Sequence, residues 1–221
     1  MDSAHRFHRL RRALLAAGLA ASLAPGALLA ARRPPIVTVL GDSITAGLGL
    51  AAAEALPAQL AAALARRGVH AVVRAAGVSG DTTADGLARV DFSVQADTDV
   101  CLVALGGNDL LQGGDPKAVQ ANLTAIVRRL KARRFGVIVA GMQAPPQIGP
   151  AYARAFDAAF PAAARAGGAV LYPDLLAGVG RDQRLLQRDA IHPNAAGARV
   201  IAERLAPVVA RALAARAGNA R

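Results

Sequence analysis

Short apolar runs recur along the chain and alternate with longer segments in which apolar residues return every three or four positions. Five of these runs are typical of buried strands and cover residues 36–40, 71–74, 100–105, 136–141 and 169–172. Strands that alternate with helices in this way favour a parallel sheet covered by helices on both faces. The sequence therefore predicts a three-layer α/β/α domain with a five-stranded parallel sheet in the order 2-1-3-4-5.

The helical segments carry their apolar residues on single stripes, as amphipathic helices do when one face packs on a core. The clearest stripes lie within residues 56–64, 119–130 and 201–209. Pro161 and Pro207 fall inside segments that are otherwise helical in pattern. Because proline removes a backbone donor and clashes with the preceding turn, a kink or break is expected at each.

Ser43 follows the first predicted strand directly, in the run Gly41-Asp42-Ser43-Ile44. In α/β sheets, ligands bind at the carboxyl ends of the strands, so a serine at such a junction can act as a nucleophile. It can do so only if a base and an oxyanion site lie elsewhere in the chain. The alternative is structural, because Asp42 or Ser43 could simply cap the next helix. This segment alone leaves both interpretations open.

Four histidines limit the choice of a base, and two of them lie in the N-terminal segment discussed below. His70 opens an apolar run with no acidic residue close in sequence, as expected of a histidine at a strand edge. His192 has Asp189 three residues before it. A carboxylate at that spacing can fold back in a turn and hold the imidazole in one tautomer. A plain surface turn before a helix capped by Asn194 is compatible with the same residues.

Two glycine-containing turns offer hydrogen-bond donors for an oxyanion. Asn108 follows the third predicted strand in the run Gly106-Gly107-Asn108-Asp109, where its side chain could donate. Gly80 lies in a turn between the second and third strands, and its backbone N–H is another candidate. Losing one such donor raises a reaction barrier by about 3 to 4 kcal/mol. Taken singly, each segment is equally an ordinary turn or helix-capping sequence.

Taken together, in this order and spacing, the segments resemble the four sequence blocks of the SGNH (GDSL) hydrolase family. The likeness runs from about Val37 to the C-terminal helix. It implies Ser43 as nucleophile, His192 as base and Asp189 as the residue that orients the base. It also implies that the backbone N–H groups of Ser43 and Gly80, with the side chain of Asn108, form the oxyanion hole. A flavodoxin-like strand order follows from the same resemblance.

Within this family the chain is similar to the periplasmic thioesterase I branch, whose members hydrolyse acyl thioesters, aryl esters and lysophospholipids. The likeness rests on residues 76–83, 86–89 and 143–161. It implies an apolar groove for the acyl chain, with walls that include Leu110, Leu111, Pro145, Pro146 and Ile148. The loops at residues 110–114 and 144–146 differ in sequence from that branch, and only 3% of the residues are aromatic. The resemblance therefore does not set the preferred acyl length.

Residues 1–31 have the pattern of a secretion signal, with an arginine-rich start, an apolar stretch and small residues suited to cleavage. The apolar stretch is shorter than a membrane span requires, although a retained N-terminal anchor stays open. Arg11 and Arg12 also permit a twin-arginine route. The sequence therefore predicts a signal peptide over 1–31, one hydrolase domain over 32–221, and a periplasmic or secreted location.

The formal net charge of +11 could indicate a nucleic-acid or anionic-lipid partner. The arginines are scattered singly or in pairs without interleaved aromatic residues, which is typical of solvated helix faces. We therefore expect a monomer with no nucleic-acid partner and at most a weak contact with a membrane surface.

Metal- and phosphate-binding motifs are missing from the sequence, so neither a metal nor another cofactor is expected. The single Cys101 lies in an apolar strand, as a small core residue.

The expected activity is hydrolysis of a carboxylic ester or thioester, with a small-molecule ester or acyl substrate and an acyl-enzyme intermediate. Two alternatives stay open. The same scaffold could remove acetyl groups from a polysaccharide, which relative rates on short and long esters would reveal. A secreted lipid-binding protein could also share the fold, but a pure binder has no need of the pair formed by Asp189 and His192.

Overall fold

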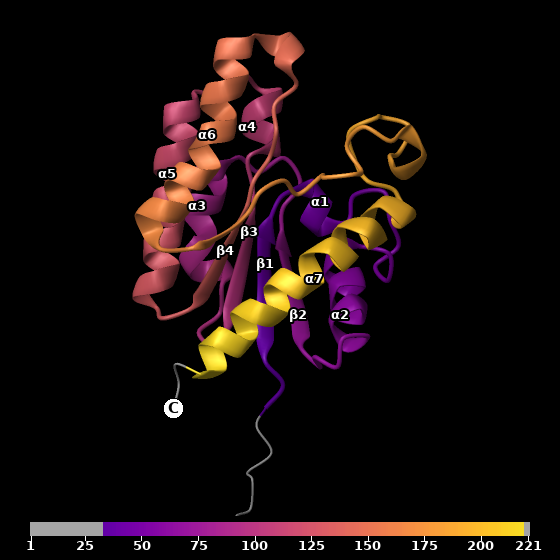
Figure 1. Ribbon diagram of the computed structural model, residues 1–221, viewed down its shortest axis with the longest axis vertical. Helices are drawn as coiled ribbons and strands as arrows, with labels where there is room; N and C mark the ends of the chain where they lie inside the picture. The colour runs from indigo at the N-terminus through magenta and orange to yellow at the C-terminus, as the bar shows by residue number, and fades with distance from the viewer. Residues whose placement is uncertain (1–32, 219–221) are drawn as a thin grey trace, which may run out of the picture. The chain divides into compact units, whose positions relative to one another are not determined.

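The computed structural model describes residues 33–218. Within the unit that begins at Pro34, five parallel strands form one sheet in the order β2-β1-β3-β4-β5 (Figure 1). The strands are β1 (Ile36–Gly41), β2 (Val72–Gly77), β3 (Val100–Ala104), β4 (Gly136–Ala140) and β5 (Val170–Tyr172). The predicted sheet and its order are confirmed, and β2 extends further than the sequence pattern indicated.

Helices cover both faces of this sheet, which gives the predicted three layers (Figure 1). On one face α2 (Leu56–Ala65) packs against α7 (Ala195–Gly218). On the other face α5 (Pro116–Ala132) lies between α3 (Thr83–Ser93) and α6 (Pro150–Gly167). Shorter helical turns occupy the connections, namely α1 (Ser43–Ala46), α4 (Gly107–Leu111), η1 (Pro146–Ile148) and η2 (Gln183–Leu185).

The central strands β1 and β3 are buried along their whole length, whereas the edge strand β2 is partly exposed. A parallel strand that is covered on both faces carries apolar residues at every position instead of at alternate positions. This covering explains why these two strands are continuous apolar runs in the sequence. Cys101 lies within β3 and is fully buried, as predicted.

The apolar helix stripes face the core as predicted, and in α5 all five stripe residues are buried: Val119, Leu123, Ile126, Val127 and Leu130. The largest fully buried side chains are Phe156 and Phe160 of α6. Their ring centroids lie 5.3 Å apart in an edge-to-face arrangement. With Tyr152, these two rings place three of the chain's seven aromatic residues on α6, which packs on the sheet and on α5.

A kink or break was expected at Pro161 and Pro207. The helices α6 and α7 continue through these residues, so neither proline breaks its helix. A proline inside a helix loses one backbone hydrogen bond and costs about 3 kcal/mol. Phe160 and Ala163 are buried on either side of Pro161, and α7 has buried residues on both sides of its proline. Packing of both halves on the core outweighs this local cost.

Glycines at the carboxyl ends of β1 and β2 allow α1 to rest directly on the sheet. Gly41 and Gly77 are partners in the register of these two strands. A Cβ atom on Gly41 would lie 2.1 Å from Oγ1 of Thr45, and one on Gly77 would lie 2.4 Å from the backbone nitrogen of Ala46. Because no larger residue permits such an approach, the two glycines determine where α1 sits.

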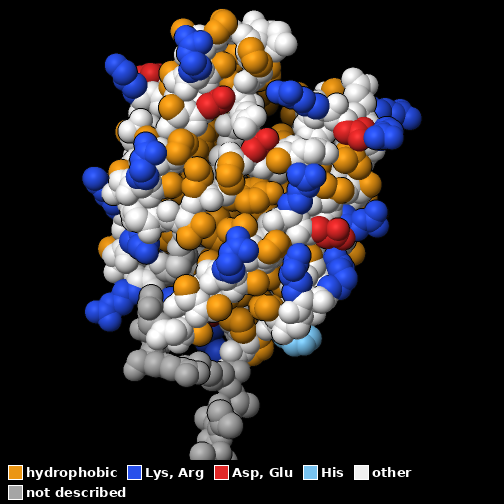
Figure 2. All heavy atoms as spheres, viewed as in Figure 1, with side chains coloured by type: hydrophobic (Ala, Val, Ile, Leu, Met, Phe, Trp, Pro, Cys, Tyr) orange, Lys and Arg blue, Asp and Glu red, His pale blue; other side chains and the backbone are white. Residues whose placement is uncertain are grey.

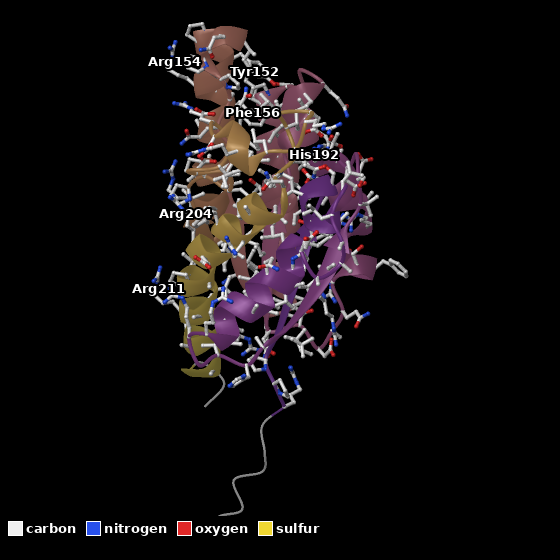
Figure 3. The ribbon with its side chains drawn as sticks, turned by 90° about the vertical axis from the view of Figure 1, so that its right-hand side faces the viewer. Tyr152, Arg154, Phe156, His192, Arg204 and Arg211 are labelled. Carbon is white, nitrogen blue, oxygen red and sulfur yellow. The ribbon has the colours of Figure 1, made fainter. Side chains whose placement is uncertain are left out.

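The surface shows no single basic patch on the face seen in Figure 2, where lysine and arginine side chains are distributed among apolar ones. Arg204 and Arg211, for example, lie along the outer side of α7 (Figure 3). His70 is exposed just before β2, as expected of a histidine at a strand edge. Among residues 33–218, no helix has both the length and the apolar character needed to cross a membrane. The predicted signal peptide, 1–31, lies outside the described residues.

Candidate active site

Ser43, His192 and Asp189 form one hydrogen-bonded chain at the carboxyl edge of the sheet. Oγ of Ser43 lies 2.8 Å from Nε2 of His192. Nδ1 of the same imidazole lies 2.6 Å from Oδ2 of Asp189. The His192 side chain is mostly buried and that of Asp189 is 42% exposed. The structure thus brings together the three residues that the sequence analysis proposed as nucleophile, base and orienting group.

A tight turn before α7 holds the carboxylate of Asp189 in place. Its Oδ1 accepts hydrogen bonds from the backbone N–H groups of Ile191 and His192, each at 3.0 Å. These two N–H groups and the imidazole lower the pKa of Asp189 to about 2, with the Ile191 bond as the largest cause. The backbone of Gln187 closes the turn by donating to the His192 carbonyl and accepting from Ala190. Asp189 therefore stays ionised throughout the neutral range, as a group that orients an imidazole must.

Ser43 is the first residue of α1, and Asp42 before it caps this helix by accepting a hydrogen bond from the Ile44 N–H at 3.0 Å. Asp42 thus caps the helix, while Ser43 is free to pair with the imidazole of His192. Asp42 is almost completely buried and lines the pocket beside Ser43. Burial raises its pKa to about 6, against the opposing effects of the Ile44 bond and the nearby His192.

Asn108 and Gly80 lie on two turns that are linked to each other by hydrogen bonds. Nδ2 of Asn108 donates to the backbone carbonyl of Asp81, the residue after Gly80, at 2.9 Å. The buried carboxylate of Asp109 accepts from the backbone N–H and the hydroxyl of Thr83, at 2.8 and 2.7 Å. The turn before α3 and the turn that begins α4 therefore behave as one unit.

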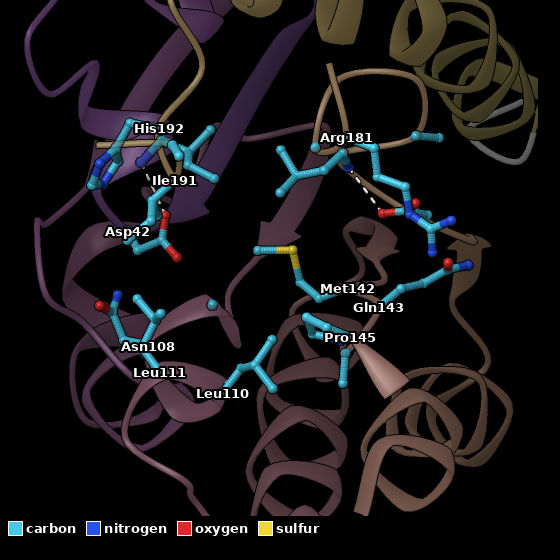
Figure 4. A pocket seen from close by; sticks show the side chains of 18 of the residues that line it. Asp42, Asn108, Leu110, Leu111, Met142, Gln143, Pro145, Arg181, Ile191 and His192 are labelled. Carbon is cyan, nitrogen blue, oxygen red and sulfur yellow. Dashed lines mark hydrogen bonds between the residues drawn. The ribbon is translucent and has the colours of Figure 1, made fainter. Parts of the chain in front are cut away.

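A pocket of about 940 Å³ opens beside Ser43. His192 and Asn108 lie on one side of it, and Arg181 and Gln143 lie on the opposite side (Figure 4). Apolar side chains form much of the wall between these sides. The wall residues include Ile44, Leu110, Leu111, Met142, Pro145, Pro146, Leu176 and Ile191. Such a lining suits an apolar chain attached to a polar reacting group.

Four of the five predicted wall residues line this pocket, namely Leu110, Leu111, Pro145 and Pro146. Ile148 is not part of the lining and is 49% exposed on η1. Gly80 is also outside the lining, on an exposed turn with a positive φ of 90°. A positive φ at this place in a turn is readily adopted by glycine and rarely by other residues.

Part of the pocket lining, on the side opposite Asn108, was not predicted from the sequence. Met142 follows β4 and Asp174 follows β5, so both belong to the carboxyl ends of strands. That position alone could have identified them as pocket candidates. Arg181 lies in an irregular connection and has no comparable signal in the sequence.

Tyr152 of α6 holds the loop between α4 and α5, which lies beside the pocket. The Tyr152 hydroxyl donates to the carbonyl of Gly114 at 2.8 Å, and its ring stacks on Phe156 with the centroids 6.1 Å apart. Both rings lie at the same end of the domain as His192 (Figure 3). Residues 33–218 contain no group of three histidine, cysteine, aspartate or glutamate side chains placed to hold a metal ion.

The fold and the sequence blocks define a hydrolase of the SGNH type, in which a parallel sheet lies between two layers of helices. The chain matches the model of the GDSL-like lipase/acylhydrolase family over residues 39–200 and belongs to that family. It is 40% identical to "Esterase TesA" of Pseudomonas aeruginosa over 156 residues, which cover 70% of this chain and 78% of that protein. It is 34% identical to "Thioesterase 1/protease 1/lysophospholipase L1" of Escherichia coli K12 over 157 residues, which cover 71% and 74% of the two chains.

Among solved structures, the domain is similar to AlinE4, an SGNH-hydrolase family esterase, with 40% sequence identity and a TM-score of 0.68. This alignment covers 81% of the present chain and 96% of AlinE4. Family and relatives together identify the protein as a hydrolase of ester bonds, of the esterase or thioesterase type.

The raised pKa of Asp42 predicts a pH-dependent cost in stability. The folded-state pKa of about 6 lies above the value of 3.8 expected in the unfolded chain, so ionisation opposes folding as pH rises through this window. Asp42→Asn keeps the cap on Ile44 and removes the charge. It should stabilise the protein at pH 7.5 by at most about 3 kcal/mol, and by much less at pH 4.5.

Thermal unfolding at the two pH values tests this expectation. Asp115→Asn is the matched control, because Asp115 caps α5 in the same way but is exposed. A gain in Asp42→Asn that is equal at both pH values would show that burial of the charge is not the cause.

Proposed function

We propose that the protein hydrolyses acyl esters or thioesters through an acyl-enzyme formed on Ser43. His192 removes the proton from the Ser43 hydroxyl during attack and later activates the water that releases the acyl group. Asp189 holds the imidazole with Nε2 toward the serine. The observation that carries the proposal is the hydrogen-bonded chain from Ser43 through His192 to Asp189, at 2.8 and 2.6 Å, beside an apolar pocket.

The oxyanion that forms on the substrate carbonyl is stabilised by three donors in this proposal. They are the backbone N–H groups of Ser43 and Gly80 and the side chain of Asn108. The Gly80 N–H donates to no other described residue, and the site of a Cβ on Gly80 has no atom within 4 Å. Nδ2 of Asn108 has two hydrogens and uses one on the Asp81 carbonyl. One donor on each turn thus remains free for a substrate oxygen.

The substrate in this proposal is a small molecule with an apolar acyl chain. The lining beside Ser43 is mainly apolar, and burial of each methylene contributes about 0.8 kcal/mol. Two relatives carry the names esterase and thioesterase, which agrees with an acyl group transferred from oxygen or sulfur. A panel of p-nitrophenyl esters of increasing chain length, acyl-CoAs and lysophospholipids tests the class of substrate.

Ser43→Ala should abolish hydrolysis across this panel while the thermal midpoint stays near that of the wild type, because the variant lacks only the hydroxyl. A fluorophosphonate probe should label the wild type and neither Ser43→Ala nor His192→Ala. Ser79→Ala is the control, since Ser79 is exposed at the same edge of the sheet but does not line the pocket. A Ser43→Ala protein that retains more than about 1% of the wild-type kcat would contradict the mechanism.

Asn108→Ala should lower kcat by roughly 10² to 10³ with a smaller change in KM, because its side chain acts mainly on charge in the transition state. Steady-state kinetics on a single p-nitrophenyl ester measures both constants. Asn122→Ala removes an amide that hydrogen-bonds to Thr83 and lies outside the pocket lining, so it serves as the control. An effect of Asn108→Ala confined to KM would mean that Asn108 only shapes the pocket.

We also propose that the enzyme is exported. The support is the arginine-rich start, apolar stretch and small residues of 1–31. In a Gram-negative host, the mature protein should be recovered from the periplasm or the medium, with an N-terminus near residue 32 in Edman sequencing. A variant without residues 2–31 should stay in the cytoplasm. Recovery of the wild type with Met1 in the cytoplasmic fraction would refute export.

A further inference from the structure

The Arg89 side chain joins the ends of β1 and β2 to the turn that follows Gly80. It lies on α3, outside the pocket lining, and its side chain is only 19% exposed. Its guanidinium donates from all three nitrogens. Nε donates to Oδ2 of Asp81 at 2.6 Å, and Nη2 donates to the carbonyl of Gly41 at 2.8 Å. Nη1 donates to the carbonyl of Ala76 at 2.9 Å and to Oγ of Ser93 at 3.0 Å.

The acceptors lie immediately beside the groups that would stabilise an oxyanion. Gly41 ends β1 and is followed, after Asp42, by Ser43. Asp81 follows Gly80, and its backbone carbonyl accepts the hydrogen bond from Asn108 at 2.9 Å. One planar cation is therefore bonded directly to the segments that carry Ser43 and Gly80, and it reaches the Asn108 side chain indirectly, through the Asp81 carbonyl.

The burial of this ion pair makes the arrangement rigid. The Asp81 side chain is 12% exposed, so the pair has little water around it. Removing one partner of a buried ion pair leaves a charge that water cannot solvate, and this loss is far larger than for surface pairs. Arginine also offers its donors in a fixed fork, so the positions of its acceptors relative to each other are set by one rigid group.

We propose that Arg89 is a positioning residue for the oxyanion hole. It holds the Gly80 turn and, through the Asp81 carbonyl, the Asn108 side chain at a fixed distance from the N–H of Ser43. Arg89 does not touch the substrate. The inference rests on the proposed function, because it concerns the donors assigned there, and it adds the residue that sets their geometry.

The variants Arg89→Lys and Asp81→Asn test this role. Lysine keeps the charge but presents one nitrogen, which cannot reach acceptors on both strands and on the turn at once. Asp81→Asn retains an acceptor and the backbone carbonyl while it removes the charge. Both variants should lower kcat on a p-nitrophenyl ester at least about 10-fold, with KM changed less than about threefold. The reason is that misplaced donors stabilise the transition state less well, whereas they contribute little to substrate binding.

A boronic acid inhibitor provides a readout that loss of stability would not move. Such an inhibitor forms a tetrahedral anion on the serine, so its affinity reports on the oxyanion donors directly. Its Kd should rise by the same factor as kcat/KM falls in both variants. The double variant of Arg89→Lys with Asn108→Ala should lose less activity than the product of the two single losses, since both changes act on one set of donors.

Arg133→Lys is the matched control. Arg133 is a partly buried arginine that donates to the backbone carbonyl of Val94, and it lies outside the pocket lining. It should keep kcat near the wild-type value even if its thermal midpoint falls as far as that of Arg89→Lys. All assays are run well below the midpoints, with folding checked by circular dichroism.

The outcomes separate this inference from the proposed function. A decrease in kcat of less than about 10-fold in both Arg89→Lys and Asp81→Asn would overturn the role of Arg89. Losses in the double variant that multiply fully would overturn it too. An equal loss of kcat in Arg133→Lys would overturn it as well. If Arg89→Lys does not fold, Asp81→Asn alone decides the question. An active Ser43→Ala would instead refute the proposed function itself.

Discussion

The hydrogen bond between Ser43 and His192 joins segments that lie 149 residues apart, and the arrangement of the whole domain serves to make it possible. β1 delivers Ser43 to the carboxyl edge of the sheet. The segment that carries His192 returns over this same edge because α7, which follows it, packs on α2. Parallel strands make such a meeting natural, since all their carboxyl ends lie at one edge. Glycine at the ends of β1 and β2 then lets α1 sit close enough for the serine to face the imidazole.

The sequence was most informative where a residue's role follows from its immediate neighbours. The strands β1 and β3 were predicted because a doubly covered strand is apolar at every position, which a reader of the sequence sees directly. The three-residue spacing of Asp189 and His192 made their pairing a candidate, and the resemblance to the SGNH family joined that pair to Ser43. These features are local, and the family resemblance supplied the order in which they combine.

The parts that were missed depend on contacts between distant segments. Nothing near Pro161 shows that the helix around it is held on both sides by the core, so a break was expected where none occurs. The sequence near Arg89 likewise cannot show that its acceptors lie on β1, on β2 and on a separate turn. The burial of Asp42 follows from the loops that close over the strand ends, and burial of this kind changes a pKa without leaving a sequence pattern.

Cys101 has a consequence for the use of this protein as an experimental system. It is the one cysteine of the chain, it lies in the middle layer of the core, and burial raises the pKa of its thiol to about 12. A protonated and inaccessible thiol is inert toward alkylating reagents and oxidants. It becomes reactive only when β3 separates from its neighbours, which requires opening of the core itself. The chain thus contains a chemical reporter of its own global unfolding, in which the rate of thiol modification under native conditions measures how often the domain opens.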